Sequence, residues 1–515
     1  MARRRLIAAI DVGSNALTMK VAQTDKKGRP QVIDTVRGNL ALGIDTYNNQ
    51  VISDESLSVL IEHLKGFQQK LDEYKITDYR IVATSAFREA ENRDYLLSQV
   101  RHATGMEIEI LSNSEERYYH HLALSEAFPE FTEVIKKGTI LLDMGAGSIQ
   151  ISTYDKGNAV FSENLRLGYL RVSELFSELQ VRSTDFPRIM DEYIGGELTS
   201  VLRLEPKGMV YKNIIATGSE LFYLGQLAGQ DTRKDPYLRS KEFETLFNRL
   251  MNTQPLALTM ELGIPADVAE LLLPAALILN KYFNQDQMKG VYLPFASLCD
   301  GLLTDLAEDL FRYKSTYDHR NDLIATAKQM AARYRSDIAH TEQVERIALA
   351  IYKAIHRRFK LPVRDRFLLR LVTILHDIGI FVDTSDFDVH TSHIILVSEL
   401  IGLTWREQET IAFACSFGVR NDLTIPAYLR LRSQPFREHV LQLAAILRIA
   451  VALDASRTQK VTQLEVKLKG NTLQMMLHGT ESFELENWAL SRSRQLFCNL
   501  FGLELNIRHV NPLLQ

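Results

Sequence analysis

The chain has 515 residues, which at about 150 residues per domain predicts three or four domains. Apolar residues make up 46% of it and charged residues 24%, and this composition excludes the disordered, collagen-like and coiled-coil classes. The 60 Lys and Arg residues against 64 Asp and Glu residues give a net charge of -4, so the chain as a whole offers polyanions no general attraction. We therefore expect no specific nucleic-acid binding, and a phosphate-rich ligand would need a local site.

The cysteine content and the apolar runs of the sequence indicate the cellular compartment in which the protein is expected. The three cysteines are odd in number and far apart, which fits neither a disulfide framework nor a C-x-x-C metal motif. The apolar stretch from Leu6 is interrupted by Asp11 after five residues, too early for an export signal. The longest other apolar run, Leu271 to Leu279, contains Pro274 and falls well below the roughly 20 residues of a membrane-spanning helix. We expect a cytoplasmic protein that does not insert into membranes.

Two α/β segments come first in the chain. Strands are predicted at Leu6 to Ile10, Leu17 to Ala22 and Ile81 to Thr84, and an amphipathic helix over Ser53 to Tyr74 with Ser53 as its cap. A second α/β segment begins near Gly138. We place the first lobe at residues 1–130.

The second lobe, residues 131–308, opens with two predicted strands, Thr139 to Leu142 and Ile149 to Tyr154, on either side of a glycine-rich turn. Long helical periodicity then replaces the strand patterns, which predicts a separate all-α domain over 309–458 with helices at His340 to Phe359 and Phe367 to His376. Residues 459–515 combine alternating strand patterns with a helix-like stretch from Glu486 to Phe501, so a small α+β domain is predicted there.

An Asp-x-Gly motif follows an apolar run twice, at Asp11 and, 132 residues later, at Asp143. The repetition suggests two similar lobes that face one another. Glycine permits a tight turn whose N–H groups and neighbouring hydroxyl suit a phosphate oxygen, and a second strand follows each turn, where a P-loop or dinucleotide fingerprint would open a helix. Each Asp can hold a hard cation such as Mg²⁺ through water. A single copy, taken alone, would be interpreted as an ordinary hairpin turn.

A third glycine-containing turn, Thr217-Gly218-Ser219, follows the apolar pair Ile214 and Ile215. Two interpretations stay open for it: it completes a phosphate clamp on the second lobe, or it only connects a strand to a helix.

Longer blocks of sequence surround these turns. They run from Asp11-Val-Gly-Ser-Asn through Ala83-Thr-Ser-Ala-Phe-Arg-Glu-Ala-Glu-Asn and Ile110-Leu-Ser-Asn-Ser-Glu-Glu to Asp143-Met-Gly-Ala-Gly-Ser. In order and spacing they resemble the exopolyphosphatase and guanosine pentaphosphate phosphatase family, within the actin and sugar kinase superfamily. The stretch that begins at Leu375, Leu-His-Asp-Ile-Gly, is similar to the HD-type domain of longer family members.

The resemblance implies an α/β fold of two actin-like, ribonuclease H-like lobes, followed by an all-α HD-like domain and a small α+β tail. It implies that Glu116 orients and deprotonates the attacking water, that Arg88 meets phosphate oxygens, that Gln150 occupies a catalytic position, and that Mg²⁺ lies near Asp11 and Asp143. A monovalent cation such as K⁺ and a homodimer are implied as well. Phosphate binding falls by resemblance on the turn residues Gly13, Ser14, Asn15, Gly145, Ala146, Gly147, Ser148, Thr217, Gly218 and Ser219.

The sequence departs from the family pattern around this site. The usual second-lobe string Asp-x-Gly-Gly-Gly-Ser-Thr-Glu has Ala146, Ile149 and Gln150 in place of its middle Gly, Thr and Glu. A neutral amide can hold a water but can neither accept its proton nor neutralise Mg²⁺ charge. Arg117 replaces the Ala of Glu-Glu-Ala-Arg, and Cys299 replaces the Arg of Leu-Arg-Glu-Gly. These changes raise the prospect of a slow or inactive enzyme, and we expect Gln150→Glu to raise turnover.

The helical domain contains His340, His376, Asp377 and His390 in the order of an HD metal site, in which imidazoles and a carboxylate meet a divalent cation. The later Asp of the family string Leu-Arg-Leu-Ala-Asp is Val451 here. We interpret the set as a candidate degenerate HD site that serves as a scaffold.

The leading hypothesis is an exopolyphosphatase-like hydrolase that releases terminal orthophosphate from linear polyphosphate with Mg²⁺. Guanosine pentaphosphate is the alternative substrate, because the same clamp would bind its terminal phosphate. A third hypothesis is a catalytically impaired sensor that binds a phosphorylated ligand or alarmone, and Gln150 is the residue that separates it from the other two. A sugar-kinase-like phosphotransferase shares the fold but lacks support from the block around Arg88.

Overall fold

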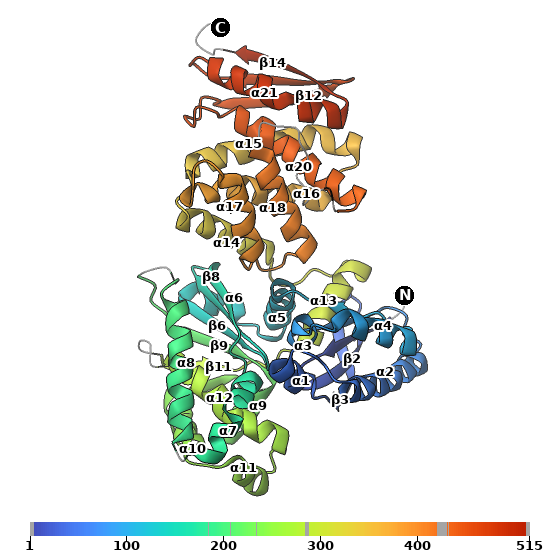
Figure 1. Ribbon diagram of the computed structural model, residues 1–515, viewed down its shortest axis with the longest axis vertical. Coiled ribbons are helices and arrows are strands. Elements are labelled where there is room, and N and C mark those ends of the chain that lie inside the picture. Colours follow the sequence, from blue (N-terminus) through green and yellow to red (C-terminus); the bar gives the residue numbers. More distant parts are fainter. Residues whose placement is uncertain are drawn as a thin grey trace. The chain divides into compact units, whose positions relative to one another are not determined.

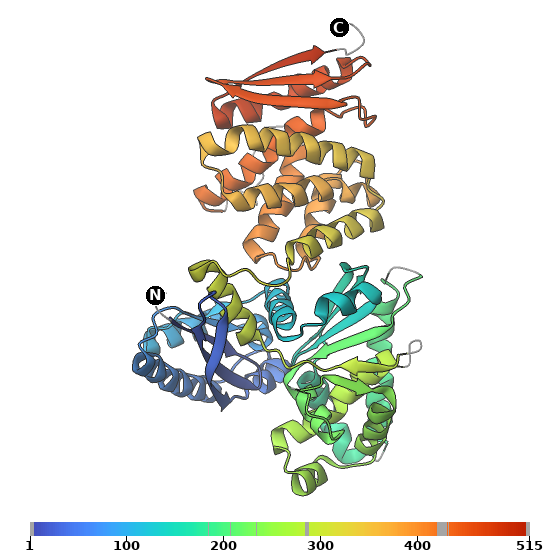
Figure 2. The same cartoon turned by 180° about the vertical axis from the view of Figure 1, so that it is seen from behind.

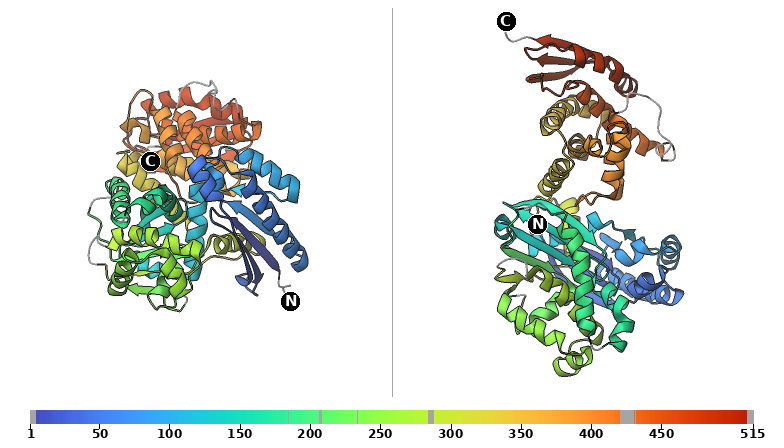
Figure 3. Two further views of the ribbon diagram at one scale, coloured as in Figure 1. Left: turned by 60° about the horizontal axis from the view of Figure 1, so that its bottom comes forward. Right: turned by 60° about the vertical axis from the view of Figure 1, so that its left-hand side comes forward.

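The computed structural model describes residues 5–183, 185–205, 208–232, 234–283, 288–419, 430 and 432–510 (Figure 1). The chain divides into two compact units, Met1–Asp322 and Leu323–Gln515, and each is described by itself. Figures 2 and 3 show both units from other directions. Among the described helices, none is both long and apolar enough to cross a membrane.

The first sheet of unit 1 has the strand order β3-β2-β1-β4-β5. Its centre is β1 (Leu6–Val12), which pairs antiparallel with β2 (Ala16–Thr24) and parallel with β4 (Tyr79–Ala83). Alternate residues of β1 enter two different core clusters, so the sheet is covered on both faces. The helix predicted from Ser53 is α2 (Asp54–Tyr74), whose cap Ser53 accepts a hydrogen bond from the Ser56 backbone N–H. The remaining elements are β3 (Pro30–Asn39), α1 (Leu42–Asn49), α3 (Ser85–Glu89), α4 (Arg93–Thr104), β5 (Glu109–Ile110) and α5 (Asn113–Ala127).

The second sheet, of order β10-β11-β9-β6-β7-β8, repeats this plan. Its strand β6 (Thr139–Met144) pairs antiparallel with β7 (Ile149–Asp155) and parallel with β9 (Asn213–Thr217). Read from β8 to β11, the order therefore matches that of the first sheet from β3 to β5. This confirms the two similar lobes predicted from the repeated motif. The other elements of the lobe include β8 (Asn158–Leu165), α7 (Tyr169–Arg182), α8 (Phe186–Leu202), α9 (Ser219–Leu227), β10 (Tyr237–Arg239), α10 (Ser240–Met251), α11 (Pro255–Leu262), α12 (Ala266–Phe283) and β11 (Gly290–Tyr292).

Helix α13 (Leu298–Phe311) follows the second sheet in sequence but packs on the first. The Lys20 ammonium of β2 donates to Asp300 at 2.7 and 2.8 Å, and the Cys299 thiol lies 3.5 Å from the Thr18 carbonyl oxygen. The chain therefore returns to the first lobe before unit 1 ends. Most of the stretch that follows residue 297 belongs to the first lobe by packing, although the predicted boundary of the second lobe lay at 308.

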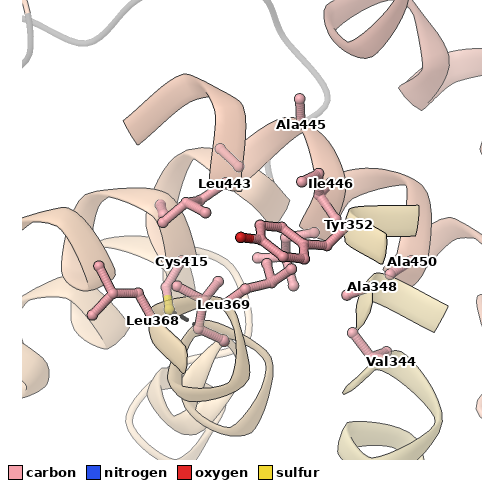
Figure 4. Close-up of a cluster of buried hydrophobic side chains, with 14 of the residues drawn as sticks. Val344, Ala348, Tyr352, Leu368, Leu369, Cys415, Leu443, Ala445, Ile446 and Ala450 are labelled. Carbon is pink, nitrogen blue, oxygen red and sulfur yellow. Dashed lines mark hydrogen bonds between the residues drawn. The ribbon is translucent and has the colours of Figure 1, made fainter. Parts of the chain in front are cut away.

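Unit 2 is built on one continuous core. Its helices are α14 (Arg320–Arg333, which starts before the division), α15 (Ile338–Phe359), α16 (Val363–Leu375), α17 (Phe387–Val397), α18 (Trp405–Val419) and α20 (Gln434–Ala452). Figure 4 shows part of the core, where Leu369 and Cys415 lie near Ile446. The same cluster includes Met475 and Phe497 of the tail, so the helical domain and the tail share a hydrophobic core. The tail comprises β12 (Gln463–Lys469), β13 (Thr472–His478), α21 (Glu484–Phe501) and β14 (Glu504–Val510).

The sequence analysis missed β14, which pairs parallel with β13 and completes a three-stranded sheet of order β12-β13-β14. Its half-buried Leu505 and Ile507 supply only two apolar alternations, too few to stand out beside the longer helix α21. The predicted helical content of the region before this tail and the mixed strand and helix content of the tail are confirmed, whereas the division between the two units lies after Asp322 and not at 308.

The contact between α13 and α5 generates a stability prediction. A Cβ atom at Gly301 would lie 1.9 Å from the Tyr119 carbonyl oxygen, whereas one at Gly66 in α2 would meet nothing within 4 Å. Gly301→Ala should therefore destabilise unit 1 by roughly 1 to 3 kcal/mol or more through overpacking. The matched control Gly66→Ala should stabilise it by about 0.5 to 1 kcal/mol, because alanine is the better helix former. Denaturant unfolding of both variants checks this, and equal effects would contradict it.

Candidate active site

A cleft of about 370 Å³ lies between the two lobes of unit 1. It is lined by both Asp-x-Gly turns, by the start of α5 and by the residues that lead into α13. Arg88 and Thr217 are not among its lining residues, and the side chain of Ser219 lies outside the described part. The predicted site residues that do line it are Asp11, Gly13, Ser14, Asn15, Glu116, Asp143, Gly145, Ala146, Gly147, Ser148, Gln150 and Gly218.

The two turns have the same backbone geometry. In the first, the Gly13 N–H donates to the Ala16 carbonyl at 2.9 Å, and in the second the Gly145 N–H donates to the Ser148 carbonyl at 2.9 Å. A Cβ atom on Gly13 would lie 2.9 Å from that same Ala16 oxygen, which explains the glycine. Each strand thus ends in a tight turn in which glycine leaves room for a neighbouring carbonyl oxygen. The sequence predicted a tight turn of this kind at both motifs.

Two buried carboxyl groups lie at the ends of β1 and β6. Burial raises the pKa of Asp11 to about 7; nearby His120 opposes this and Glu116 adds to it. Burial also raises the pKa of Asp143, although Thr217 donates a hydrogen bond to its Oδ1 at 3.0 Å. Asp11 Oδ1 is a buried oxygen without a hydrogen-bond partner. Burial therefore disfavours the ionised forms of both carboxyl groups, and Asp11 lacks a full set of partners.

These carboxylates fit a cation with few protein ligands. Within the described ranges, no group of three or more His, Cys, Asp and Glu side chains is close enough to hold a metal ion. Mg²⁺ commonly binds through one or two carboxylates and completes its shell with water and substrate phosphates. Asp11, with its unpartnered oxygen, and Asp143 could hold such an ion in this way.

Glu116 reaches the cleft from the first turn of α5. The helix starts with a capping box, in which Ser112 accepts from the Glu115 N–H and the Glu115 carboxylate accepts from the Ser112 N–H. Glu115 is thereby committed to the helix end, while Glu116 lines the cleft. Arg88 Nη1 donates to Glu116 Oε2 at 3.0 Å and to the Leu111 carbonyl at 2.7 Å. The structure thus uses Arg88 to hold Glu116.

Gln150 lies against Arg117, and this contact joins two departures from the family pattern. Arg117 is fully buried, and its Nε donates to Gln150 Oε1 at 3.1 Å. Its Nη2 donates to the Glu163 carbonyl at 3.0 Å, and Nη1 donates to the Ser162 hydroxyl. The substitutions at 117 and 150 are therefore in direct contact. A carboxylate at 150 would form a buried ion pair with Arg117, so its capacity to accept a proton would be reduced.

Several cleft residues escaped the sequence analysis. His120 lies one helical turn after Glu116 on the same face of α5, and its Nδ1 is 3.5 Å from Asp143 Oδ2. The i, i+4 spacing from Glu116 was a signal that could have found it. Ser85 and Lys20 also line the cleft. Ser85 lies within the block that begins at Ala83, so its position was marked although no role was given to it, whereas no local pattern marked Lys20.

In unit 2 the structure brings together three of the four candidate HD residues. The His340 and His376 rings lie 5.3 Å apart between centroids, and Asp377 Oδ2 accepts from Arg457 at 3.2 Å. Asp454, which the sequence analysis missed, lies 2.7 Å from His340 Nδ1. Half-buried His390 has no hydrogen bond or ion pair with this group in the described part of the chain. No metal-holding cluster is found among the described residues, so the HD assignment stays a prediction.

The two lobes, with their repeated turns and shared strand order, define an actin-like α/β protein. The chain belongs to the Ppx/GppA phosphatase family, whose model matches residues 20–308. A second model, Ppx/GppA phosphatase domain III, matches residues 324–495.

Solved structures agree with this fold. A Ppx/GppA family member from Aquifex aeolicus has 20% identity and a TM-score of 0.50, and the match covers 60% of this chain and 99% of that one. An exopolyphosphatase from Cytophaga hutchinsonii ATCC 33406 has 17% identity and a TM-score of 0.52, over 59% of this chain and 98% of that one. At these identities the likeness establishes the fold.

The raised pKa of Asp11 predicts a pH-dependent stability in the metal-free protein. Between about pH 4, near the unfolded value, and about pH 7 the folded protein holds a proton that the unfolded chain releases. Stability should therefore fall as the pH rises through this window and level off above it. Asp11→Asn stays neutral, so its melting temperature should fall less between these pH values, by at least a few degrees relative to the wild type.

Thermal unfolding in the presence of a chelator checks this prediction. Asp72→Asn, an exposed aspartate of α2, is the matched control and should keep the wild-type pH profile. Identical profiles for Asp11→Asn and the wild type would contradict the prediction.

Proposed function

We propose that the protein is a phosphohydrolase that releases terminal orthophosphate from linear polyphosphate by attack of water. The observation that supports this most is the meeting of Glu116 with both Asp-x-Gly turns in one cleft. Phosphoryl transfer needs alignment, charge neutralisation and a group that positions the nucleophile, with little covalent help from the protein. Membership of a phosphatase family supports the same class of reaction.

In the proposed reaction the turns bind the terminal phosphate through their backbone N–H groups and the hydroxyls of Ser14 and Ser148. Glu116 orients a water and accepts its proton as the water oxygen bonds to the terminal phosphorus. The bridging P–O bond breaks, and the shortened chain leaves. Arg88 keeps the Glu116 carboxylate in place through its 3.0 Å hydrogen bond.

Mg²⁺ is proposed as the cofactor, held by Asp11 and Asp143. When bound, such an ion neutralises charge on phosphate oxygens. Gln150 adds no charge to this set, and Arg117 already occupies its amide oxygen. We therefore expect a slower enzyme than a family member with Glu at this position.

Glu116→Gln tests the role of this carboxylate. The amide keeps an oxygen that can accept from Arg88, so the local packing should survive, but it cannot accept a proton. Orthophosphate release from polyphosphate should fall about 100-fold or more, the usual range for a general base. Release is measured with purified protein, polyphosphate and Mg²⁺, and Glu62→Gln on the exposed side of α2 is the control.

An unchanged rate in Glu116→Gln would remove Glu116 from the mechanism. A wild type that binds polyphosphate without releasing orthophosphate would instead favour the sensor hypothesis.

A second candidate substrate, guanosine pentaphosphate, is favoured by an exposed aromatic ring at the cleft. Phe295 lines the cleft and is 45% exposed, and Phe222 packs edge-on against it with 5.6 Å between centroids. The Lys20 ammonium is 5.6 Å from the Phe295 ring centre, and Arg37 lines the same region. An aromatic face beside cations can stack a nucleobase while its phosphates extend toward the turns.

Phe295→Ala distinguishes the two substrates. Loss of one stacked base costs about 1 to 3 kcal/mol, so the KM for guanosine pentaphosphate should rise about 5-fold to 100-fold. The KM for polyphosphate should change less than about twofold, because that substrate has no base. Phe381→Ala, at a Phe of unit 2 that is 54% exposed, is the control. Equal changes for both substrates would contradict a base-binding role for Phe295.

A further inference from the structure

A tyrosine outside the two Asp-x-Gly motifs contacts Ser14 of the first Asp-x-Gly turn, which is the phosphate turn of the first lobe in the proposed function. The Tyr47 hydroxyl of α1 is 2.7 Å from Ser14 Oγ and 2.9 Å from Ser85 Oγ, and the two serine oxygens are 3.0 Å apart. The three hydroxyls therefore form a closed triangle. Ser14 and Ser85 line the cleft, whereas Tyr47 does not.

Arg171, in the first turn of α7 on the second lobe, covers this tyrosine. Its guanidinium carbon lies 4.0 Å from the centre of the Tyr47 ring, a cation–π contact. Its Nη2 donates to both carboxylate oxygens of Glu89 at 2.8 Å, and its Nε donates to the Gly147 carbonyl at 2.9 Å. One side chain thus links Tyr47 and Glu89 of the first lobe to the second phosphate turn.

The second turn packs directly on the hydroxyl triangle. A Cβ atom at Gly147 would lie 2.0 Å from the Tyr47 oxygen and 2.6 Å from Ser85 Oγ. Only glycine leaves room for this approach. The two phosphate turns, which belong to different lobes, are therefore held against one another through Tyr47.

The hydroxyl triangle has a limited supply of protons. Each hydroxyl carries one proton and can accept further hydrogen bonds. When Ser14 and Ser85 turn their protons toward a bound phosphate, the only proton of the triangle left to donate to their oxygens is that of Tyr47. Burial raises the pKa of the Tyr47 phenol, so it keeps this proton at neutral pH. Phenylalanine at this position would preserve the ring and its contact with Arg171 but lose the donor.

We propose that Tyr47 and Arg171 are positioning residues that hold the two phosphate turns in register, so that Ser14 and Ser85 can donate together to one phosphate group. Neither residue lines the cleft, so both act through the serines and Gly147. This inference rests on the proposed function, because it assigns the cleft to phosphate.

Tyr47→Phe tests the proposal through binding of inorganic phosphate to the full chain, measured by calorimetry with Mg²⁺ present. The dissociation constant for orthophosphate, and the KM for polyphosphate, should rise about tenfold, the scale expected for hydrogen bonds to a charged group. The melting temperature without ligand should change little. Tyr74→Phe is the matched control, because it also removes one hydrogen bond, that from the Tyr74 hydroxyl to Asp34 at 3.0 Å in the same lobe.

Arg171 is tested by two replacements. Arg171→Lys keeps the charge but loses the bidentate pair with Glu89, and Arg171→Met loses both. Phosphate affinity should fall in the order wild type, Lys, Met. In a double-mutant cycle with Tyr47→Phe, the losses should be less than additive, because both variants loosen the same contact.

Unchanged phosphate affinity in Tyr47→Phe, or a loss matched by Tyr74→Phe, would overturn the inference and leave Tyr47 as ordinary packing. A wild type that binds orthophosphate but does not hydrolyse polyphosphate would refute the proposed function while the affinity series still decides the role of Tyr47. A wild type that neither binds orthophosphate nor hydrolyses polyphosphate would overturn both.

Discussion

The close approach of Gly147 to the Tyr47 hydroxyl is the contact on which the geometry of the cleft depends. A single added carbon there would lie 2.0 Å from the Tyr47 oxygen, so the two lobes could not meet as they do. A set of polar contacts between the lobes surrounds this point. It consists of the hydroxyls of Ser14 and Ser85, the guanidinium of Arg171 and the carboxylate of Glu89. A single half-buried polar contact of this kind contributes little to the free energy of unfolding, yet it fixes the direction and distance between two groups. Because the two Asp-x-Gly turns belong to different lobes, these contacts fix the distance and orientation of one turn relative to the other.

The contact between Arg117 and Gln150 changes the meaning of the departures from the family pattern. In the sequence, Arg117 and Gln150 are two separate departures near one proposed site. In the structure they are neighbours: the Arg117 guanidinium is fully buried and occupies the Gln150 amide oxygen, a backbone carbonyl and the Ser162 hydroxyl. A buried guanidinium needs several acceptors, and a neutral amide supplies one without adding charge to a cleft that already contains Asp11, Asp143 and Glu116. The amide of Gln150 therefore suits the buried guanidinium of Arg117, and the two departures from the family pattern should be interpreted together.

Local sequence was informative where backbone chemistry decides the structure. Short apolar runs marked β1 and β2, Ser53 marked the start of α2, and the two Asp-x-Gly motifs located both turns and the repeated lobes. These features depend on residues adjacent in the chain. Tyr47 and Arg171 could not be predicted in the same way, because their partners lie 33 and 82 positions away and their own neighbours carry no pattern. Asp454 lies three residues after Val451, where the family Asp was expected, and its partner is 114 positions away. Helix α13 returns to the first sheet for a similar reason, since its partners on β1, β2 and α5 are distant in sequence.

Two buried clusters of ionisable groups, one in each unit, are only partly satisfied by partners within the protein. In unit 2 the Asp377 carboxylate pairs with the Arg457 guanidinium at 3.2 Å, and Asp454 lies 2.7 Å from His340 Nδ1 and accepts from the Gln459 backbone N–H at 2.9 Å. Each carboxylate thus has a partner within the protein, yet Asp377 Oδ1, His340 Nε2 and His376 Nε2 are buried atoms without a hydrogen-bond partner. In the cleft of unit 1, Arg88 serves Glu116, while Asp11 retains a buried oxygen with no partner and a raised pKa. Burying a carboxylate without a cation is costly, and the protein must either protonate it or neutralise it from outside. The cleft and the helical unit therefore both retain buried atoms that could meet a cation from outside, and in the cleft a phosphate ligand would add further negative charge.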